Sequence, residues 1–179
     1  MTTKKEKKSR AKKIPVETEY FVFEDTVMFK LAGSREAYTT ISIDKWPHVS
    51  KYIWYLGKAN YPICYELGQM TLHRFIYTYI FGQYPPSELY VDHIDRNKLN
   101  NTDQNLRLAT PQENSFNKTT TSNLKGVRKI SENNYTASIT KDGTKHEIKN
   151  IETEADAANC YNLIAESLFG EFAALNKIE

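Results

Sequence analysis

The stretch VDHIDRNKLNNTDQNLRLATPQENSFNK, residues 91–118, decides the local fold of this chain. Residues 89–91 are β-prone, whereas residues 95–103 are rich in Asn, Asp and Lys, which is typical of a loop. Residues 105–108 alternate polar and apolar side chains, as expected of a half-buried return strand. The stretch therefore predicts a strand, a loop and a second strand in this order.

A helix should follow the second strand. Thr110 can cap it, Pro111 suits the first helical position, and Glu113 completes a capping box. Asn114 would then lie in the first turn of an ordered helix rather than in a flexible loop.

Three side chains of the stretch could take part in catalysis or metal binding. Asp92 and His93 stand at the end of the first strand, and Asn114 stands at the start of the helix. Two oxygen ligands and one imidazole are what is needed to hold a hard divalent cation beside a base that activates water. The pattern therefore indicates a small metal-assisted hydrolytic site.

The stretch resembles the motif of HNH nucleases. His93 and Asn105 are 12 positions apart, and Asn105 and Asn114 are 9 apart. The resemblance implies a ββα-metal fold in which His93 is the general base against a DNA phosphodiester and Asn105 is a catalytic residue that braces both the loop and His93. By position, Asp92 and Asn114 would be the metal ligands, since a phage homing-endonuclease subgroup has Asn where many members have His. An Asp–Asn pair favours Mg²⁺ or Mn²⁺ over Zn²⁺.

Each of these residues also has an ordinary interpretation. An Asp-His pair can be a hydrogen-bonded surface pair, and Asn-rich segments often only form turns. Taken together, at these spacings, the residues favour the nuclease. Upstream, His73 and Arg74 match a His-Arg pair frequent in the same subgroup: His73 is either structural or contacts phosphate, and Arg74 is a candidate phosphate contact.

Composition is consistent with a soluble protein of one large or two small domains in 179 residues. Cys64 and Cys160 are far apart and form no CxxC pair, which argues against a disulfide framework or a zinc ribbon. No apolar run approaches the length of a membrane span, and no secretory signal is evident. We therefore expect a cytoplasmic protein (in the host cytoplasm if phage-encoded), with no membrane partner and no small-molecule substrate.

The net charge is unevenly distributed. Residues 1–13 carry seven Lys or Arg and one Glu, a net +6, whereas the whole chain is +2. Residues 1–16 are thus predicted to form a basic, disordered arm. Such an arm either tethers the protein to DNA through phosphate contacts or simply solubilises it.

Residues 17–118 are predicted to be the nuclease domain, with the ββα-metal motif at 89–118. Residues 18–46 should be rich in strands. Any helix formed by residues 70–81 should end at Gly82. Three aromatic residues match recurring positions in phage HNH proteins, and we expect them in the core rather than stacked on bases: Trp54, Tyr61 and Tyr65.

Residues 119–123 are predicted to be a linker to a second unit, residues 124–179. Strands should begin near residue 125 and cover 135–140 and 145–149, with a hairpin turn at Asp142-Gly143. A helix should begin at Thr153 and end at Gly170, with one apolar stripe. The predicted fold class is α+β, with a three-stranded antiparallel sheet packed on one helix at the C-terminus.

The second unit resembles the ethylene-response-factor-like (APETALA-type) DNA-binding domain over residues 122–176. The resemblance rests on Lys-Gly-Val at 125–127, YTASI at 135–139, EADAA at 154–158 and FGEFAALN at 169–176. It implies that the sheet face opposite the helix enters the DNA major groove. Facing the helix we expect Val127, Tyr135, Ala137, Ile139 and Ile148. Facing outward, as DNA contacts, we expect Lys125, Arg128, Ser138, Thr140 and Lys145, with Glu147 beside them.

Charge supports this orientation. Residues 124–149 hold six Lys or Arg and three Asp or Glu, while residues 152–179 hold one and six. A basic sheet backed by an acidic helix would present one face to phosphate. Without the resemblance, an ordinary solvated face would be the simpler interpretation, and the family's outward arginines and tryptophans are sparse here.

The sequence therefore predicts a metal-dependent DNA endonuclease, similar to phage homing endonucleases, that acts on double-stranded DNA as a monomer or homodimer. The alternative is a DNA-binding regulator that retains the nuclease fold without cutting. The presence of all four motif positions favours the enzyme.

Overall fold

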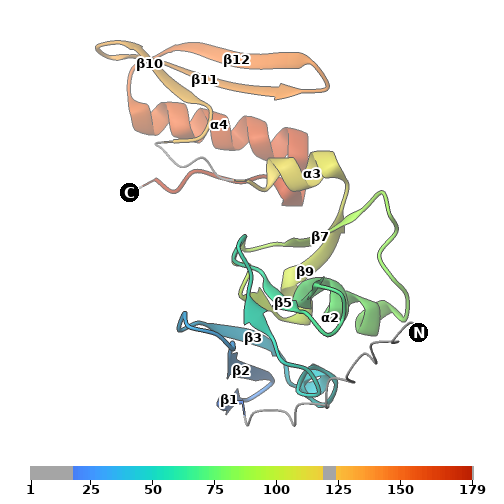
Figure 1. The fold of residues 1–179 in the computed structure, drawn as a ribbon. Coiled ribbons are helices and arrows are strands. Elements are labelled where there is room, and N and C mark those ends of the chain that lie inside the picture. Colours follow the sequence, from blue (N-terminus) through green and yellow to red (C-terminus); the bar gives the residue numbers. More distant parts are fainter. Residues whose placement is uncertain (1–17, 119–123, 179) are drawn as a thin grey trace, which may run out of the picture.

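The computed structural model describes residues 18–118 and 124–178 (Figure 1). The predicted basic arm and linker lie outside these residues. We call residues 18–118 the N-terminal part and residues 124–178 the C-terminal unit. No described helix is long and apolar enough to cross a membrane.

The N-terminal part begins with a four-stranded sheet in the order β1-β2-β3-β8. Its strands are β1 (Tyr20–Phe23), β2 (Thr26–Lys30), β3 (Tyr38–Ser42) and β8 (Asn100–Asn101). The first three pair antiparallel, whereas β8 joins β3 in parallel, with Ile41 opposite Asn101. This pairing brings a strand from the middle of the 91–118 stretch against the N-terminal sheet. The predicted richness in strands over residues 18–46 is confirmed.

A second small sheet and one helix complete this core. The sheet consists of β4 (Tyr55–Leu56), β5 (Pro62–Cys64) and β6 (Met70–Thr71), and it follows a short 3-10 turn, η1 (Ile43–Lys45), and α1 (Trp46–Val49). Helix α2 (Leu72–Phe81) ends at Gly82, which adopts a left-handed φ of 68°. Trp54 is buried as predicted, whereas Tyr61 is half-buried and Tyr65 is 58% exposed, so the expectation of a core position is wrong for Tyr65.

The 91–118 stretch folds in the predicted order of strand, loop, strand and helix. Strand β7 (Tyr90–His93) pairs antiparallel with β9 (Leu106–Ala109), and the short 3-10 turn η2 (Asp103–Asn105) precedes β9. Helix α3 (Pro111–Phe116) has the predicted capping box: Glu113 N donates to Thr110 Oγ1 at 3.2 Å, and Thr110 N donates to Glu113 Oε2 at 2.8 Å. Asn105 lies in η2 rather than in the strand.

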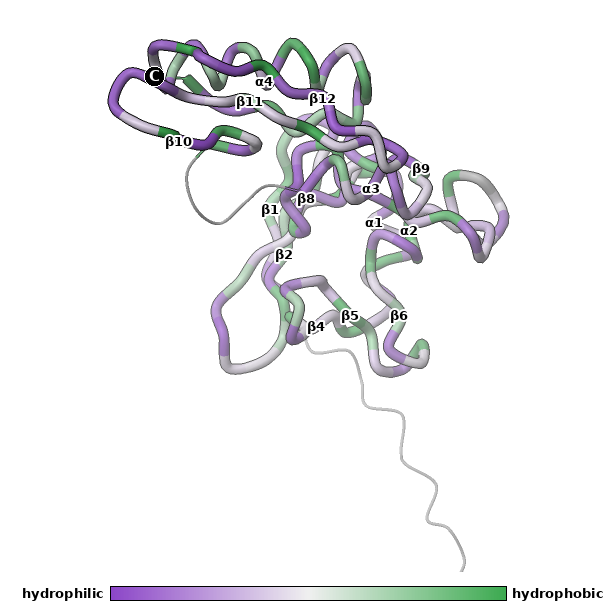
Figure 2. The backbone as a smooth tube through the Cα atoms, turned by 90° about the horizontal axis from the view of Figure 1, so that it is seen from above, coloured by the Kyte–Doolittle hydropathy of each residue, from purple (hydrophilic) through white to green (hydrophobic). Residues whose placement is uncertain are grey.

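The C-terminal unit is a three-stranded antiparallel sheet packed on one helix, as predicted. The strands are β10 (Val127–Ser131), β11 (Asn134–Lys141) and β12 (Thr144–Ile151), in the order β10-β11-β12. At the predicted hairpin turn, Asp142 and Gly143 both have positive φ. Helix α4 (Glu154–Phe169), capped by Thr153, alternates hydrophobic and hydrophilic residues along its length (Figure 2) and buries Ala157, Ala158, Tyr161, Ala165 and Phe169. The turn η3 (Gly170–Phe172) follows it.

One expectation for this sheet, the outward position of Lys125, is wrong, whereas that for Ile148 is confirmed in its orientation. Lys125 precedes β10, and its Nζ donates to the carbonyl oxygens of Phe116 and Lys118 at 2.8 and 2.6 Å, so it does not lie on the outward face. Ile148 pairs with buried Ala137 and therefore faces the helix side, yet it remains 42% exposed because β12 is an edge strand.

The N-terminal part and the C-terminal unit are packed together, with α3 between them (Figure 1). The ring of Phe116 on α3 stacks on that of Phe169 at the end of α4, with centroids 3.6 Å apart. The two predicted domains are therefore in direct contact.

Candidate active site

Strand β7 ends in the Asp-His pair. In its antiparallel pairing with β9, Asp92 is opposite Arg107 and His93 is opposite Leu106. Both side chains are buried, with only 7% of Asp92 and 4% of His93 exposed. Burial of an acid and an imidazole at a strand end requires polar partners, and the structure supplies them.

The carboxylate of Asp92 is held by one of its two oxygens. Oδ2 accepts from Arg107 Nε and from its Nη2, both at 3.1 Å, and from Asn117 Nδ2 at 3.0 Å. The same Asn117 amide donates to the carbonyl oxygen of His93 at 2.8 Å. No described residue is recorded as a donor to Oδ1, so this oxygen is the one that Asp92 can offer to a cation.

The imidazole of His93 is held by Asn101. Nε2 of His93 lies 3.1 Å from Oδ1 of Asn101, while Nδ2 of Asn101 donates to the carbonyl oxygen of Lys98 at 3.1 Å. A carbonyl can only accept, so the orientation of the Asn101 amide is fixed, and its Oδ1 must accept as well. Nε2 of His93 therefore carries the proton, and Nδ1 carries the lone pair that a general base needs.

The N-terminal sheet reinforces this arrangement. Asn101 is fully buried, and its Nδ2 also donates to Oγ1 of Thr39 on β3 at 2.9 Å. Thr39 Oγ1 in turn donates to the carbonyl oxygen of Leu99 at 2.8 Å. The pairing of β8 with β3 thus sets the orientation of the imidazole.

Aromatic rings enclose the other side of His93. The ring centroids of His73 and His93 are 5.0 Å apart at an interplanar angle of 66°, and Tyr61 lies 4.9 Å from His73. Burial lowers the pKa of His93. The hydrogen bond with Asn101 raises it, but by less than burial lowers it. Burial also lowers the pKa of His73 to about 3. Both imidazoles are therefore neutral at pH 7.

His73 is a structural neighbour of His93. It is 7% exposed, its Nε2 lies 3.4 Å from Oγ1 of Thr71, and its Nδ1 is buried without a recorded partner. Its ring packs against the His93 ring and limits the space in which that ring can turn.

Asn105 braces the loop rather than touching the imidazole. Its Oδ1 accepts from Asp95 N at 2.9 Å, and its Nδ2 donates to Asp95 Oδ1 at 2.8 Å and to Asn100 O at 2.7 Å. Its backbone oxygen accepts from Ile94 N at 2.9 Å. These bonds fix the turn that returns the chain from β7 to β8.

Asn114 is half-buried and shares a hollow with the Asp-His pair. Two adjoining hollows, of about 360 and 240 Å³, have four lining residues in common: Tyr61, Asp92, His93 and Asn114. Arg96, Lys98 and Lys118 line the first, and Arg74 lines the second. Nζ of Lys98 is fixed by Ala59 O at 2.9 Å and lies 4.4 Å from the centre of the Tyr61 ring. The candidate ligands and base thus stand between two cationic recesses.

The donor set suits an oxygen-preferring cation. Asp92 Oδ1 and the Asn114 amide oxygen are hard ligands, and Mg²⁺ in enzymes is commonly held by one or two carboxylates together with substrate phosphate and water. Within residues 18–118 and 124–178, no group of three or more His, Cys, Asp or Glu side chains could hold an ion. These residues fit Mg²⁺ or Mn²⁺ better than Zn²⁺.

The outward face of the C-terminal sheet carries the other predicted contacts. The register places Arg128 opposite Thr136, Ser138 opposite Glu147 and Thr140 opposite Lys145. Arg128, Thr140 and Lys145 are exposed, and Ser138 is half-buried. Glu147 lies between two lysines, with an ion pair to Lys145 and one to Lys149 at 3.2 Å, so it neutralises part of this face.

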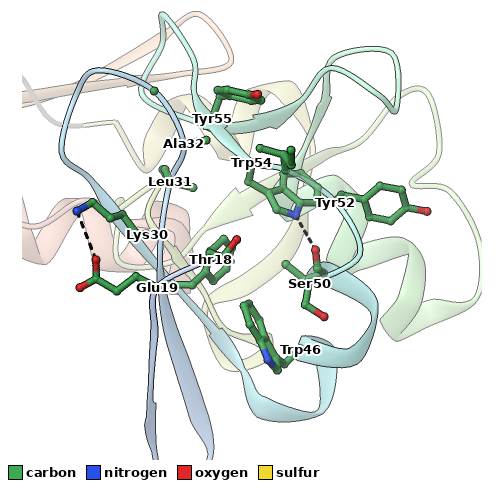
Figure 3. Close-up of a pocket in the computed structure, with 14 residues that line it drawn as sticks. Thr18, Glu19, Lys30, Leu31, Ala32, Trp46, Ser50, Tyr52, Trp54 and Tyr55 are labelled. Atoms are coloured by element: carbon green, nitrogen blue, oxygen red, sulfur yellow. Dashed lines mark hydrogen bonds and ion pairs between the residues drawn. The ribbon is translucent and has the colours of Figure 1, made fainter. Parts of the chain in front are cut away.

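Another hollow, of about 420 Å³, is lined by residues other than these. Trp46, Tyr52, Trp54 and Tyr55 contribute to its wall (Figure 3). The one acid among its lining residues, Glu19, pairs with Lys30 at 3.4 Å, and no histidine lines it. Its chemistry is that of an apolar recess, without the acid–imidazole pair of the Asp92–His93 hollow.

Three contributors to the site were not predicted as such: Asn101, Arg107 and Asn117. Local sequence indicates only a turn for Asn101, in the Asn-rich segment, and only an alternating strand, residues 105–108, for Arg107. Asn117 follows the short helix and is 95% buried, which no local pattern signals. The arrangement of all three depends on contacts between segments distant in sequence.

The HNH endonuclease family model matches residues 71–116, which include the Asp-His pair, Asn105 and Asn114. A protein of Acanthamoeba polyphaga mimivirus, the uncharacterized HNH endonuclease L560, is 60% identical over 99% of this chain and 98% of its own length. Protein 3.8 of Escherichia phage T7 is 39% identical over 49% of this chain and 76% of its own length. No solved structure matches the chain. With a relative this similar along nearly its whole length, the chain belongs to the HNH endonuclease family.

Proposed function

We propose that this protein is a metal-dependent endonuclease that hydrolyses phosphodiester bonds of double-stranded DNA, with His93 as the general base. The observation that carries the proposal is the fixed tautomer of His93. Its Nε2 is committed to Asn101, so the neutral imidazole has its lone pair on Nδ1, and His93 lines the same hollow as Asp92 and Asn114. A water-activating base needs this protonation state and a fixed orientation.

Asp92 and Asn114 would hold the cation through Asp92 Oδ1 and the Asn114 amide oxygen. When bound, a Mg²⁺ or Mn²⁺ ion supplies positive charge to the phosphate and to the leaving oxygen. Nδ1 of His93 would take the proton from the water that attacks phosphorus, and the bond between phosphorus and the leaving oxygen would break. Asn105 would keep the β7–β8 turn in shape, as its bonds to Asp95 and Asn100 suggest.

The scissile strand would run from one cationic recess to the other. Arg74 would hold a phosphate on one side of the metal, and Arg96 with Lys118 would hold one on the other. Lys98 is already committed to Ala59 O and the Tyr61 ring, so it would act mainly as a fixed positive charge. Lysine and arginine contacts to phosphate position a duplex without reading its sequence.

The C-terminal sheet would hold duplex DNA beside this site, as its resemblance to the APETALA-type domain implies. Arg128, Ser138, Thr140 and Lys145 are the proposed contacts. With Glu147 paired to both neighbouring lysines, this face offers few free cations, so much of the affinity would come from elsewhere. A homing role for the enzyme would require cleavage at one long target site, which a map of cleavage sites would reveal.

The experiment is Mg²⁺-dependent cleavage of supercoiled plasmid by wild type, His93→Ala and Asp92→Asn. We expect His93→Ala to cut about 10²–10⁴-fold more slowly while binding DNA nearly as well. Equal rates for wild type and His93→Ala would exclude His93 as the base. DNA binding without Mg²⁺-dependent cleavage by wild type would instead indicate the non-cutting regulator.

The plasmid assay also separates a monomer from a homodimer. One such centre cuts one strand, so a monomer should accumulate the nicked circle before the linear form. A homodimer that cuts both strands should yield linear DNA directly, with a rate that rises more steeply than in proportion to protein concentration while the dimer assembles.

A further inference from the structure

Arg107 links the C-terminal unit to the candidate metal ligand Asp92. Its Nε and Nη2 donate to Asp92 Oδ2, whereas its Nη1 donates to the carbonyl oxygen of Glu171 at 2.8 Å. The guanidinium carbon lies 3.9 Å from the centre of the Phe172 ring, and the Glu171 carboxylate is 3.6 Å from Nη1. The turn η3 of the C-terminal unit therefore contacts both an edge and a face of the Arg107 guanidinium, which in turn binds Asp92.

The C-terminal unit also holds the helix that carries Asn114. Helix α3 has six residues, too few to be stable without tertiary contacts. Nζ of Lys125 donates to the carbonyl oxygen of Phe116, the last residue of α3, and the Phe116 ring stacks on Phe169 at an interplanar angle of 16°. A cation at a helix C-terminus also complements the helix dipole.

A further set of bonds joins these two attachments inside the C-terminal unit. The backbone N–H of Lys125 donates to Asn176 Oδ1 at 2.6 Å, and Asn176 Nδ2 donates to the carbonyl oxygen of Lys125 at 3.0 Å. Asn176 also exchanges hydrogen bonds with Asn162 on α4, at 2.7 and 3.0 Å. The start of β10, helix α4 and the segment after η3 thus form one support behind the site.

We propose that the C-terminal unit positions both metal ligands of the nuclease, Asp92 through Arg107 and Asn114 through Lys125 and Phe169. This inference rests on the proposed function. Arg107, Lys125 and Phe172 are positioning residues, since they act through the ligands and not on the substrate. Three donors occupy Asp92 Oδ2, so the carboxylate presents Oδ1 at one fixed orientation, and the support sets its separation from Asn114.

The inference assigns the C-terminal unit a task besides DNA binding. A separate DNA-binding module on a tether would change affinity for DNA and leave the metal centre alone. If the unit supports the ligands, substitutions in it must change metal affinity, even when no DNA is present. Partners that orient metal ligands commonly contribute 10- to 100-fold to metal affinity or activity.

The test measures Mn²⁺ binding to the full chain without DNA, by electron paramagnetic resonance, below the unfolding temperature of each variant. Arg107→Lys keeps the charge but loses the two-pronged contact, and we expect binding about 10- to 100-fold weaker. Phe172→Leu removes only the cation–π contact and should weaken binding about 2- to 5-fold. Lys125→Met keeps the apolar stem and loses the bonds to α3, so it should weaken binding by a similar factor.

Leu163→Ala is the matched control. Leu163 lies on α4 of the same unit, is 67% exposed and makes none of the described contacts to α3 or Arg107. Its variant should bind Mn²⁺ as wild type does. In cleavage assays, the three positioning variants should need more Mg²⁺ for half-maximal rate, with an unchanged KM for DNA.

The outcomes separate this inference from the proposed function. Wild-type Mn²⁺ affinity in Arg107→Lys, Phe172→Leu and Lys125→Met, together with lost binding in Asp92→Asn, would overturn the positioning role alone. Unchanged Mn²⁺ binding in Asp92→Asn would overturn the assignment of the metal ligands in the proposed function. Weaker binding in the three variants and in Asp92→Asn, but not in Leu163→Ala, supports both.

Discussion

Nε2 of His93 lies 3.1 Å from Oδ1 of Asn101, a residue that is fully buried against the N-terminal sheet. Asn101 in turn is fixed by Thr39 on β3 and by the carbonyl oxygen of Lys98. The proposed base is therefore supported by the N-terminal sheet, whereas the candidate metal ligands are linked to the C-terminal unit through Arg107 and through α3. The N-terminal sheet and the C-terminal unit thus support different parts of one site.

Replacing Asn101 should impair chemistry more than binding. Asn101→Ala removes the acceptor that keeps the proton on Nε2, so His93 would populate the wrong tautomer and turn more freely. We expect kcat to fall about 10-fold or more, because a positioned base contributes about 10²–10⁴-fold in total. Single-turnover cleavage and DNA binding in Ca²⁺ would separate the two effects. An unchanged kcat would mean that Asn101 does not orient the base.

The pH dependence of cleavage should reflect a buried base. His93 is active when neutral, and burial lowers its pKa below the ordinary 6.5. A cation bound nearby would lower it further. We therefore expect log kcat/KM to rise with pH only below about 6.5 and to be level above it. A midpoint above 6.5 in the acid limb would contradict this assignment.

Folding stability should decline in acid because of His73. Its pKa is about 3 in the folded protein, whereas an exposed imidazole titrates near 6.5. Between these values the unfolded chain binds a proton that the folded one does not, so the free energy of unfolding falls as pH decreases from 6.5 towards 3. The loss should be about 2 kcal/mol by pH 5.

Urea unfolding at pH 7 and pH 5 would check this loss in wild type and in His73→Leu. The variant should lose less stability between the two pH values, since it lacks the buried imidazole. The same loss in both proteins would show that His73 does not carry the acid sensitivity.

Outward residues of the C-terminal sheet should affect DNA binding through salt dependence. Arg128→Gln and Lys145→Gln would each remove one proposed phosphate contact and lower the slope of log K against log salt concentration by about 1. Lys125→Met is a useful comparison, because Lys125 lies behind α3 and should leave the slope nearly unchanged. Fluorescence anisotropy with a duplex would measure these slopes, and unchanged slopes in both glutamine variants would place the sheet away from DNA.

Much of the fold could be predicted because its signals are local. The capping box of Thr110 and Glu113, the Asp142-Gly143 turn and the apolar stripe of α4 each lie within a few residues of one another. They fixed the helix starts and the hairpin without any knowledge of tertiary packing.

What could not be predicted depends on pairing between distant segments. Asn101 becomes the partner of His93 only because β8 pairs with β3, about 60 residues earlier. Arg107 reads as an ordinary strand residue, and its role requires contacts to Glu171 and Phe172. Lys125 reads as a basic strand residue, but the strand begins two positions later and the docking of α3 captures its side chain.

Chemical rescue of a His93 variant tests the central claim most directly. His93→Gly removes the buried imidazole and leaves a cavity beside Asp92 and Asn101, into which free imidazole can enter. We predict that this variant cuts DNA about 10²–10⁴-fold more slowly than wild type in Mg²⁺, and that added imidazole accelerates it while leaving wild type unaffected. Cleavage by His93→Gly at the wild-type rate, with no response to imidazole, would contradict the assignment of His93 as the base of this nuclease.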